Sequence, residues 1–94
     1  MGILVTPTFL RTAKKLHQQQ KAILDKAVRT VAASPSCGEV KVGDLAGVYV
    51  YKFRMGSQLC LLAYRVLEEE SIKLLMVGPH ENFYRDLKRL GGDE

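Results

Sequence analysis

VYVYKFRMGSQLCLLAYRV, residues 48–66, contains the clearest β pattern in the chain. Its first part, Val48 to Arg54, is rich in β-branched and aromatic residues, which favours a strand. Gly56-Ser57 predicts a turn. The nearly continuous apolar run from Gln58 to Val66 is typical of a central strand that is buried on both faces. Because the connection between them is short, the two strands are expected to pair antiparallel.

A third strand and a helix are expected after this hairpin. Glu68-Glu69-Glu70 predicts a charged turn, and Ile72 to Val77 predicts a strand that continues the antiparallel meander. Gly78-Pro79 is expected to end the sheet. A short helix starting near Pro79 is then predicted, because apolar residues recur at helical spacing in Phe83, Leu87 and Leu90.

The N-terminal half predicts one strand and two helices. Ile3 to Val5 is a short apolar run, and Thr6-Pro7 combines an N-cap residue with a proline suited to the first helical turn. This first helix is expected to reach about Gln18. A second helix with a period near 3.6 is expected from near Gln20, and it ends at Ser34-Pro35 because the residue before a proline disfavours helical geometry.

The whole chain predicts an α+β fold. Ser34 to Gly47 is interpreted as a connecting segment with little regular structure, so the element order is β-α-α-β-β-β-α. The expected architecture has two layers, a small and mainly antiparallel sheet packed on an N-terminal helical hairpin. We expect residues 1–94 to form a single domain, with residues 91–94 as a flexible tail.

Composition sets broad limits on function. The formal net charge of +4 and the pI of about 9.2 favour polyanions or an acidic protein as partners. The sequence shows neither a leader-like N-terminus nor the roughly 20 consecutive apolar residues that a membrane span needs, so a cytoplasmic location is expected. Cys37 and Cys60 lack metal-ligand spacing, and no metal or cofactor is predicted.

Three segments carry a shared pattern: Asp44 to Gly47 with the strand from Val48 to Arg54, then Leu61 to Val66, then Val77 to Tyr84. In this order they resemble the RelE/ParE family of toxins. The first is similar to the family's leucine-x-glycine segment and its strand ending in a basic residue. Leu61 to Val66 is similar to the central strand. Val77 to Tyr84 resembles the closing segment, in which glycine, a basic residue or histidine, and tyrosine follow the last strand.

This resemblance implies a toxin that a co-expressed antitoxin neutralises. RelE-like relatives enter the ribosomal A site and cleave mRNA, whereas ParE-like relatives inhibit DNA gyrase. The expected partners are therefore a cognate antitoxin and either the ribosome with its mRNA or DNA gyrase. Antitoxins of this kind present a disordered segment that folds on the toxin, often as a helix.

Metal-independent RNA cleavage needs a group that takes the 2′ proton, a group that protonates the 5′ leaving oxygen, and positive charge near the phosphate. Strand alternation places Tyr49, Tyr51 and Phe53 on one face and Lys52 and Arg54 on the other. We expect the aromatic face to pack on the helices. Lys52 and Arg54 then match the family's basic pair and are predicted to be catalytic, the alternative being ordinary solvated charges.

The C-terminal helix contributes further candidates. With a helix start near Pro79, His80 and Tyr84 lie one turn apart on one face, and Lys88 extends that face. Histidine exchanges a proton near neutral pH, and tyrosine can stack on a base or bind a phosphate. His80 and Tyr84 are therefore predicted to be catalytic, with packing as the alternative. Lys41 and Lys88 are predicted to bind RNA.

One position departs from the nuclease pattern. RelE-like nucleases carry an arginine in the central strand that supports the phosphate, and Leu61 stands at that place in this chain. The ribosome-dependent endoribonuclease is the leading hypothesis. The departure favours the ParE-like alternative, a gyrase inhibitor without nuclease chemistry. A third hypothesis is a domain that has lost activity and acts as a binding protein.

Overall fold

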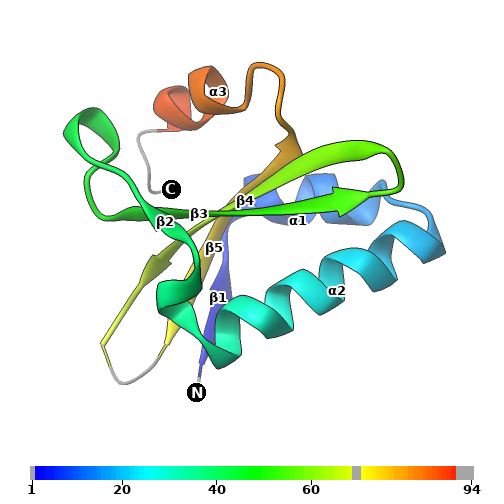
Figure 1. Cartoon of the computed structure of the whole chain (residues 1–94), viewed down its shortest axis with the longest axis horizontal. Helices are drawn as coiled ribbons and strands as arrows, with labels where there is room; N and C mark the ends of the chain where they lie inside the picture. Colours follow the sequence, from blue (N-terminus) through cyan, green and yellow to red (C-terminus); the bar gives the residue numbers. More distant parts are fainter. Residues whose placement is uncertain (1, 69–70, 91–94) are drawn as a thin grey trace.

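The computed structural model describes residues 2–68 and 71–90 and confirms the α+β fold (Figure 1). A five-stranded sheet has the order β1-β5-β4-β3-β2. The outer strand β1 runs parallel to β5, and all other neighbours pair antiparallel. The strands are β1 (Ile3–Val5), β2 (Glu39–Val40), β3 (Val48–Met55), β4 (Gln58–Val66) and β5 (Ile72–Pro79).

Helices lie on both faces of this sheet, so α3 adds a layer to the two that the sequence predicts. The helices α1 (Pro7–Lys14) and α2 (Gln18–Ala33) pack on one face, and α3 (Phe83–Leu90) packs on the other (Figure 1). Two short 3₁₀ turns, η1 (Pro35–Cys37) and η2 (Gly43–Leu45), lie before and after β2. No helix among the described residues has both the length and the apolar character needed to cross a membrane.

The first helix starts as predicted and ends earlier. The Thr6 hydroxyl oxygen accepts a hydrogen bond from the Phe9 backbone N–H at 3.0 Å and donates one to the Leu75 carbonyl at 2.6 Å. The predicted extension to Gln18 is wrong, because α1 stops at Lys14 and α2 already begins at Gln18. The Gln20 side chain accepts from the His17 backbone N–H at 2.9 Å, and this capping interaction starts α2 before the expected position near Gln20.

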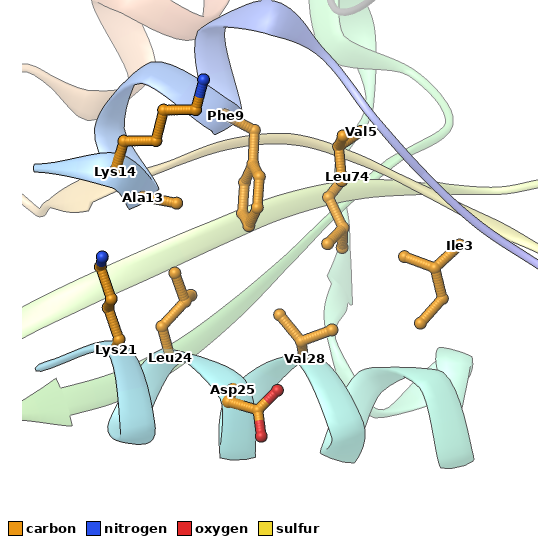
Figure 2. Close-up of a pocket in the computed structure, with 10 residues that line it drawn as sticks. All are labelled: Ile3, Val5, Phe9, Ala13, Lys14, Lys21, Leu24, Asp25, Val28 and Leu74. Atoms are coloured by element: carbon orange, nitrogen blue, oxygen red, sulfur yellow. The ribbon is translucent and has the colours of Figure 1, made fainter. Parts of the chain in front are cut away.

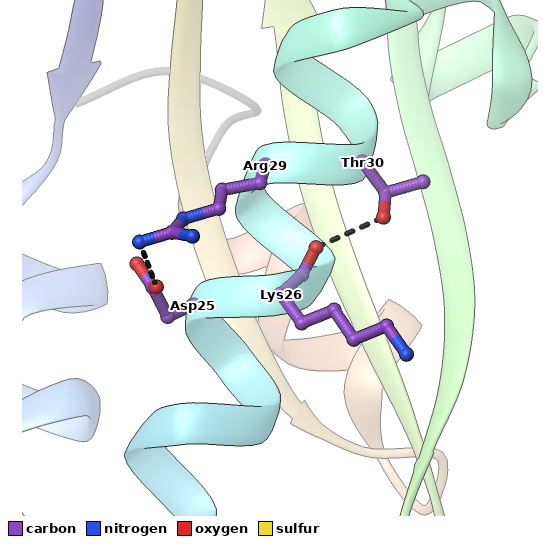
Figure 3. A network of polar contacts seen from close by, with 4 residues as sticks. All are labelled: Asp25, Lys26, Arg29 and Thr30. Atoms are coloured by element: carbon purple, nitrogen blue, oxygen red, sulfur yellow. Dashed lines mark hydrogen bonds and ion pairs between the residues drawn. The ribbon is translucent and has the colours of Figure 1, made fainter.

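The second helix is amphipathic, as its period predicts. Its buried face includes Leu24, Ala27 and Val31. Its exposed face carries an Asp25–Arg29 ion pair at 3.0 Å and a bond from the Thr30 hydroxyl to the Lys26 carbonyl (Figure 3). Such exposed i,i+4 pairs contribute only a few tenths of a kcal/mol, so burial of the apolar face dominates.

The central strand is buried on both faces, as predicted. Leu62 and Tyr64 point toward α1 and α2, whereas Leu61 and Ala63 point toward α3. The predicted position of the aromatic face of β3 is confirmed, because its ring side chains pack against the core on the α1–α2 side. That face consists of Tyr49, Tyr51 and Phe53.

The segment from Ser34 to Gly47 is more ordered than predicted. It contains η1, η2 and β2, and β2 pairs with β3 through Glu39–Val50 and Val40–Tyr49. A tertiary contact fixes this segment: the Tyr64 hydroxyl donates to the Pro35 carbonyl at 2.7 Å and accepts from the Gly38 N–H at 3.1 Å. The order therefore comes from a side chain on β4, which local composition does not reveal.

The C-terminal helix begins later than predicted. Strand β5 continues through Gly78 to Pro79, and His80 still donates its backbone N–H to the Leu59 carbonyl at 3.1 Å. Asn82 then turns the chain with a φ of 61°, and α3 starts at Phe83. His80 therefore precedes the helix. The predicted turn residues 69–70 and the predicted tail 91–94 lie outside the described residues.

Candidate functional site

The candidate site lies on the sheet face that α3 partly covers. Residues paired across neighbouring strands share a face. Lys52 pairs with Leu61, which in turn pairs with Gly78. Two positions along, Arg54 pairs with Leu59, whose carbonyl accepts from the backbone of His80. The register therefore places Lys52, Arg54 and His80 on this one face in two adjacent rows.

Tyr84 brings α3 into contact with His80 on this face. Its ring meets the His80 ring edge-on, with centroids 6.3 Å apart, and meets Phe83 in the same manner at 5.7 Å. Phe83 is buried and anchors the start of α3, while Tyr84 is half-buried and His80 is exposed. The predicted neighbourhood of His80 and Tyr84 is confirmed, although a turn before the helix creates it and one helical turn does not.

Lys41 reaches the same place from the segment after β2. Its Nζ lies 5.0 Å from the centroid of the Tyr84 ring, which is a cation–π distance. It also forms an ion pair with Glu39. The hydrogen bond with Glu39 raises the pKa of Lys41, and the bond from Lys41 lowers the pKa of Glu39. Both side chains are therefore charged at neutral pH.

The structure thus groups four predicted residues and adds a fifth. Lys41, Tyr84 and His80 form a continuous chain of contacts, and Lys52 lies near enough to Glu39 to lower the pKa of that carboxyl. The sequence prediction missed Glu39. Its only sequence signal is a Glu-x-Lys spacing, which places both side chains on one face of a strand once the strand itself is known.

Two other predicted residues lie at the margin of this group. The Arg54 guanidinium donates to the Ser57 carbonyl at 3.3 Å, within the hairpin turn between β3 and β4. Lys88 is exposed one turn beyond Tyr84 on α3. Both can add positive charge to the same face. Their predicted roles in catalysis and RNA binding stay predictions, as do those of the grouped residues.

Leu61 lies beneath the site and not in it. Its side chain is fully buried in the core that α3 covers, together with Phe83 and Leu87. An apolar residue here lets α3 pack on the sheet, whereas a charged side chain would need a polar partner. The described residues hold no group of three or more His, Cys, Asp or Glu that could bind a metal.

A second surface feature lies on the opposite face. The helices α1 and α2 leave between them a mostly apolar groove of about 440 Å³, which Figure 2 shows with its lining side chains. Phe9, Leu24 and Val28 lie on its walls, and the exposed edge strand β1 closes one side. Lys14, Lys21 and Asp25 also line it, with the two lysines at the same end.

Several solved structures of RelE toxins share this fold. The free form of an E. coli RelE double mutant gives a TM-score of 0.71 at 23% identity, covering 93% of this chain and 90% of that one. Two toxin–antitoxin complexes are also similar. The intact E. coli RelBE complex gives 0.67 at 23% identity, covering 85% and 96%. RelBE2 from Mycobacterium tuberculosis gives 0.63 at 24% identity, covering 84% and 96%.

At these identities the similarity to solved structures establishes the fold, and the sequence establishes the family. Residues 3–88 match the family described as ParE-like toxin of type II bacterial toxin-antitoxin system. The chain therefore belongs to this family of toxins. No curated protein matches the sequence.

Proposed function

We propose that this toxin is a metal-independent endoribonuclease that cleaves mRNA at the ribosome. The observation that carries the proposal is the contact chain Lys41–Tyr84–His80 on the same sheet face as Lys52. These side chains come from three separate parts of the sequence and provide cationic, aromatic and proton-transferring groups together. A purely structural role does not require that combination on an open face.

The proposed chemistry is attack of a ribose 2′-oxygen on the adjacent phosphorus. The new O2′–P bond forms as the P–O5′ bond breaks, which leaves a 2′,3′-cyclic phosphate and a 5′-hydroxyl. The 2′-hydroxyl gives up its proton as O2′ attacks, and the leaving O5′ takes up a proton. His80 carries out one of these two transfers and a water molecule the other, a role that histidine suits near neutral pH. Tyr84 stacks on a base beside the cut, and Lys41 and Lys52 stabilise the charge that develops on the phosphate oxygens.

The test is induction of the toxin in bacteria with mapping of RNA 5′ ends. We expect cuts within translated messages that the variant His80→Ala/Tyr84→Ala no longer makes. The matched control is His17→Ala/Tyr49→Ala, which removes a histidine and a tyrosine away from the site. Cuts that persist in the first variant, or that vanish equally in the control, would contradict the proposal.

DNA gyrase is the second candidate target, and one observation favours it. Leu61 is buried at the place where RelE-like nucleases have an arginine, so part of the phosphate-stabilising charge is missing. In that case induction should cause DNA damage with intact messages, and His80→Ala/Tyr84→Ala should leave toxicity unchanged. Both targets are cytoplasmic, so we propose that the protein acts in the cytoplasm.

A cognate antitoxin is the proposed partner in both cases. The similar structures of RelBE and RelBE2 are toxin–antitoxin complexes. The apolar groove between α1 and α2 offers a surface for an antitoxin segment, and Lys14 and Lys21 favour acidic residues at one end. The variant Val28→Lys should weaken co-purification of the neighbouring gene's product, while Lys26→Ala, which is exposed on α2 outside the groove lining, should not. Equal recovery with both variants would argue against this groove.

A further inference from the structure

The carboxylate of Glu39 is unusual among the side chains of the candidate site. Lys41, Lys52 and Arg54 are cationic, and all lie on the face that α3 partly covers. Glu39 lies directly among them, because it pairs with Val50 across β2 and β3. A negative side chain at this place works against binding of any polyanion, so its presence calls for a specific role.

Backbone register fixes where Glu39 lies. Paired residues share a face, and Glu39 therefore lies diagonally next to Lys52 on β3. The Lys41 backbone N–H donates to the Val48 carbonyl at 2.8 Å, which keeps Lys41 in the same ladder and on the same face. Glu39 and Lys52 also line one hollow at this edge of the sheet. The Glu39 carboxylate thus has a lysine on either side.

The two lysines interact with Glu39 to different degrees. Lys41 forms an ion pair and a hydrogen bond with the carboxylate, and both partners stay charged because the contact raises the pKa of Lys41 and lowers that of Glu39. Lys52 adds a weaker attraction from farther away. The Glu39 side chain is 66% exposed, compared with 23% for Lys41. The carboxylate can therefore swing into solvent while Lys41 stays against Tyr84.

A carboxylate and a phosphodiester bind a lysine in the same way. Both are anions whose oxygens accept charge-assisted hydrogen bonds from an ammonium group. We propose that Glu39 occupies a phosphate position between Lys41 and Lys52, and that a backbone phosphate of single-stranded RNA takes this position when the carboxylate moves away. This inference rests on the proposed function, and it makes Glu39 a specificity-determining residue that weakens binding of RNA until enough other contacts have formed.

The test measures binding of a fluorescein-labelled single-stranded RNA at several salt concentrations. Each backbone phosphate contact in single strands adds about 0.7 to the slope of log affinity against log salt. Glu39→Gln should steepen that slope by about this amount. Affinity at low salt should rise roughly two- to fivefold, the range that corresponds to an exposed ion pair. Circular dichroism establishes that each variant is folded.

Two further variants separate a local contact from a general change in charge. Asp25→Asn is the matched control, because Asp25 is also an exposed carboxylate paired with a cation, but it lies on α2 on the other side of the sheet. It changes the net charge by the same amount and should leave the slope unchanged. In a Lys41→Gln background, Glu39→Gln should no longer increase affinity. An equal gain from Asp25→Asn, or a gain that persists without Lys41, would overturn the inference.

A second probe separates failure of this inference from failure of the proposed function. Inorganic pyrophosphate, titrated against the amide resonances of Lys41 and Lys52, reports on the phosphate position without any RNA. Glu39→Gln should bind it more tightly than the natural chain does. If RNA does not bind but this gain is seen, the nuclease proposal fails and the phosphate position stands. If the pyrophosphate gain is missing, the phosphate position itself is refuted.

Discussion

Replacing Tyr64 by phenylalanine removes a single oxygen that holds the segment before β2. The hydroxyl donates to the Pro35 carbonyl at 2.7 Å and accepts from the Gly38 N–H at 3.1 Å, and the side chain is fully buried. An intramolecular hydrogen bond contributes about 0.5 to 1.5 kcal/mol net. Loss of both bonds should therefore lower the free energy of unfolding by about 1 to 3 kcal/mol, which lowers Tm by roughly 5 to 20 °C in a domain of this size.

Urea unfolding of the natural chain and of Tyr64→Phe measures this difference directly. Tyr49→Phe is the matched control. Its ring stacks on Tyr64 with centroids 5.5 Å apart, and the substitution leaves that ring in place. We expect the control to change stability by less than about 0.5 kcal/mol. A change of that small size for Tyr64→Phe as well would refute the reasoning, because the two bonds would then contribute nothing.

The same substitution has a pH signature. Burial raises the pKa of Tyr64 from its ordinary 10.0 to about 12. Since the folded-state pKa is the higher one, the neutral hydroxyl stabilises the fold fully below about pH 10 and loses this effect as the pH rises toward 12. The stability difference between the natural chain and Tyr64→Phe should therefore shrink over that range. A difference that stays constant up to pH 12 would contradict this assignment.

Three further substitutions test other parts of the structure. In Gly38→Ala the added Cβ would lie 2.5 Å from the Tyr64 hydroxyl oxygen, so β2 or the Tyr64 side chain must shift. We expect weaker RNA binding together with a loss of stability measurable by urea unfolding. Leu61→Arg puts a charge into a fully buried position and should lower the free energy of unfolding by about 3 kcal/mol or more. In the 5′-end assay this variant should cut mRNA no more strongly than the natural chain does. Thr6→Ala removes both a helix cap and a buried bond to Leu75, which should cost about 1 to 3 kcal/mol in the same unfolding measurement.

Much of the sheet was predictable because its signal is local. The alternation in β3 placed Lys52 opposite the aromatic side chains, and the apolar run in β4 predicted burial on both faces; both predictions are confirmed. The neighbourhood of His80 and Tyr84 was also predicted, but for the wrong reason. A backbone hydrogen bond to Leu59 holds His80 beside the sheet, just after β5 ends. A bond between residues so far apart in the chain leaves no periodic signal in the sequence.

The position of Glu39, the site residue that the sequence prediction missed, depends on tertiary contacts. Strand β2 has two residues, which is too short to show any alternation. Its position follows from the bond between Gly38 and Tyr64, which are 26 residues apart. Without that strand, Glu39 has no predicted place beside Lys41. The residue types of the site could therefore be predicted from the sequence. Their proximity could not, because it depends on long-range hydrogen bonds.

The pairing of β1 with β5 also has a consequence for how the toxin is made. The Thr6 hydroxyl donates to a carbonyl 69 positions further along the chain, and among the described strands β1 lies at the edge of the sheet, next to β5. During synthesis β1 leaves the ribosome early and its neighbour β5 leaves late. The apolar faces of α1 and α2 therefore stay exposed until the strands that cover them have been made. Long-range pairing of this kind slows folding. We therefore expect a delay between synthesis of the toxin and the formation of its folded, active state. During this delay an antitoxin can bind the chain before it is completely folded.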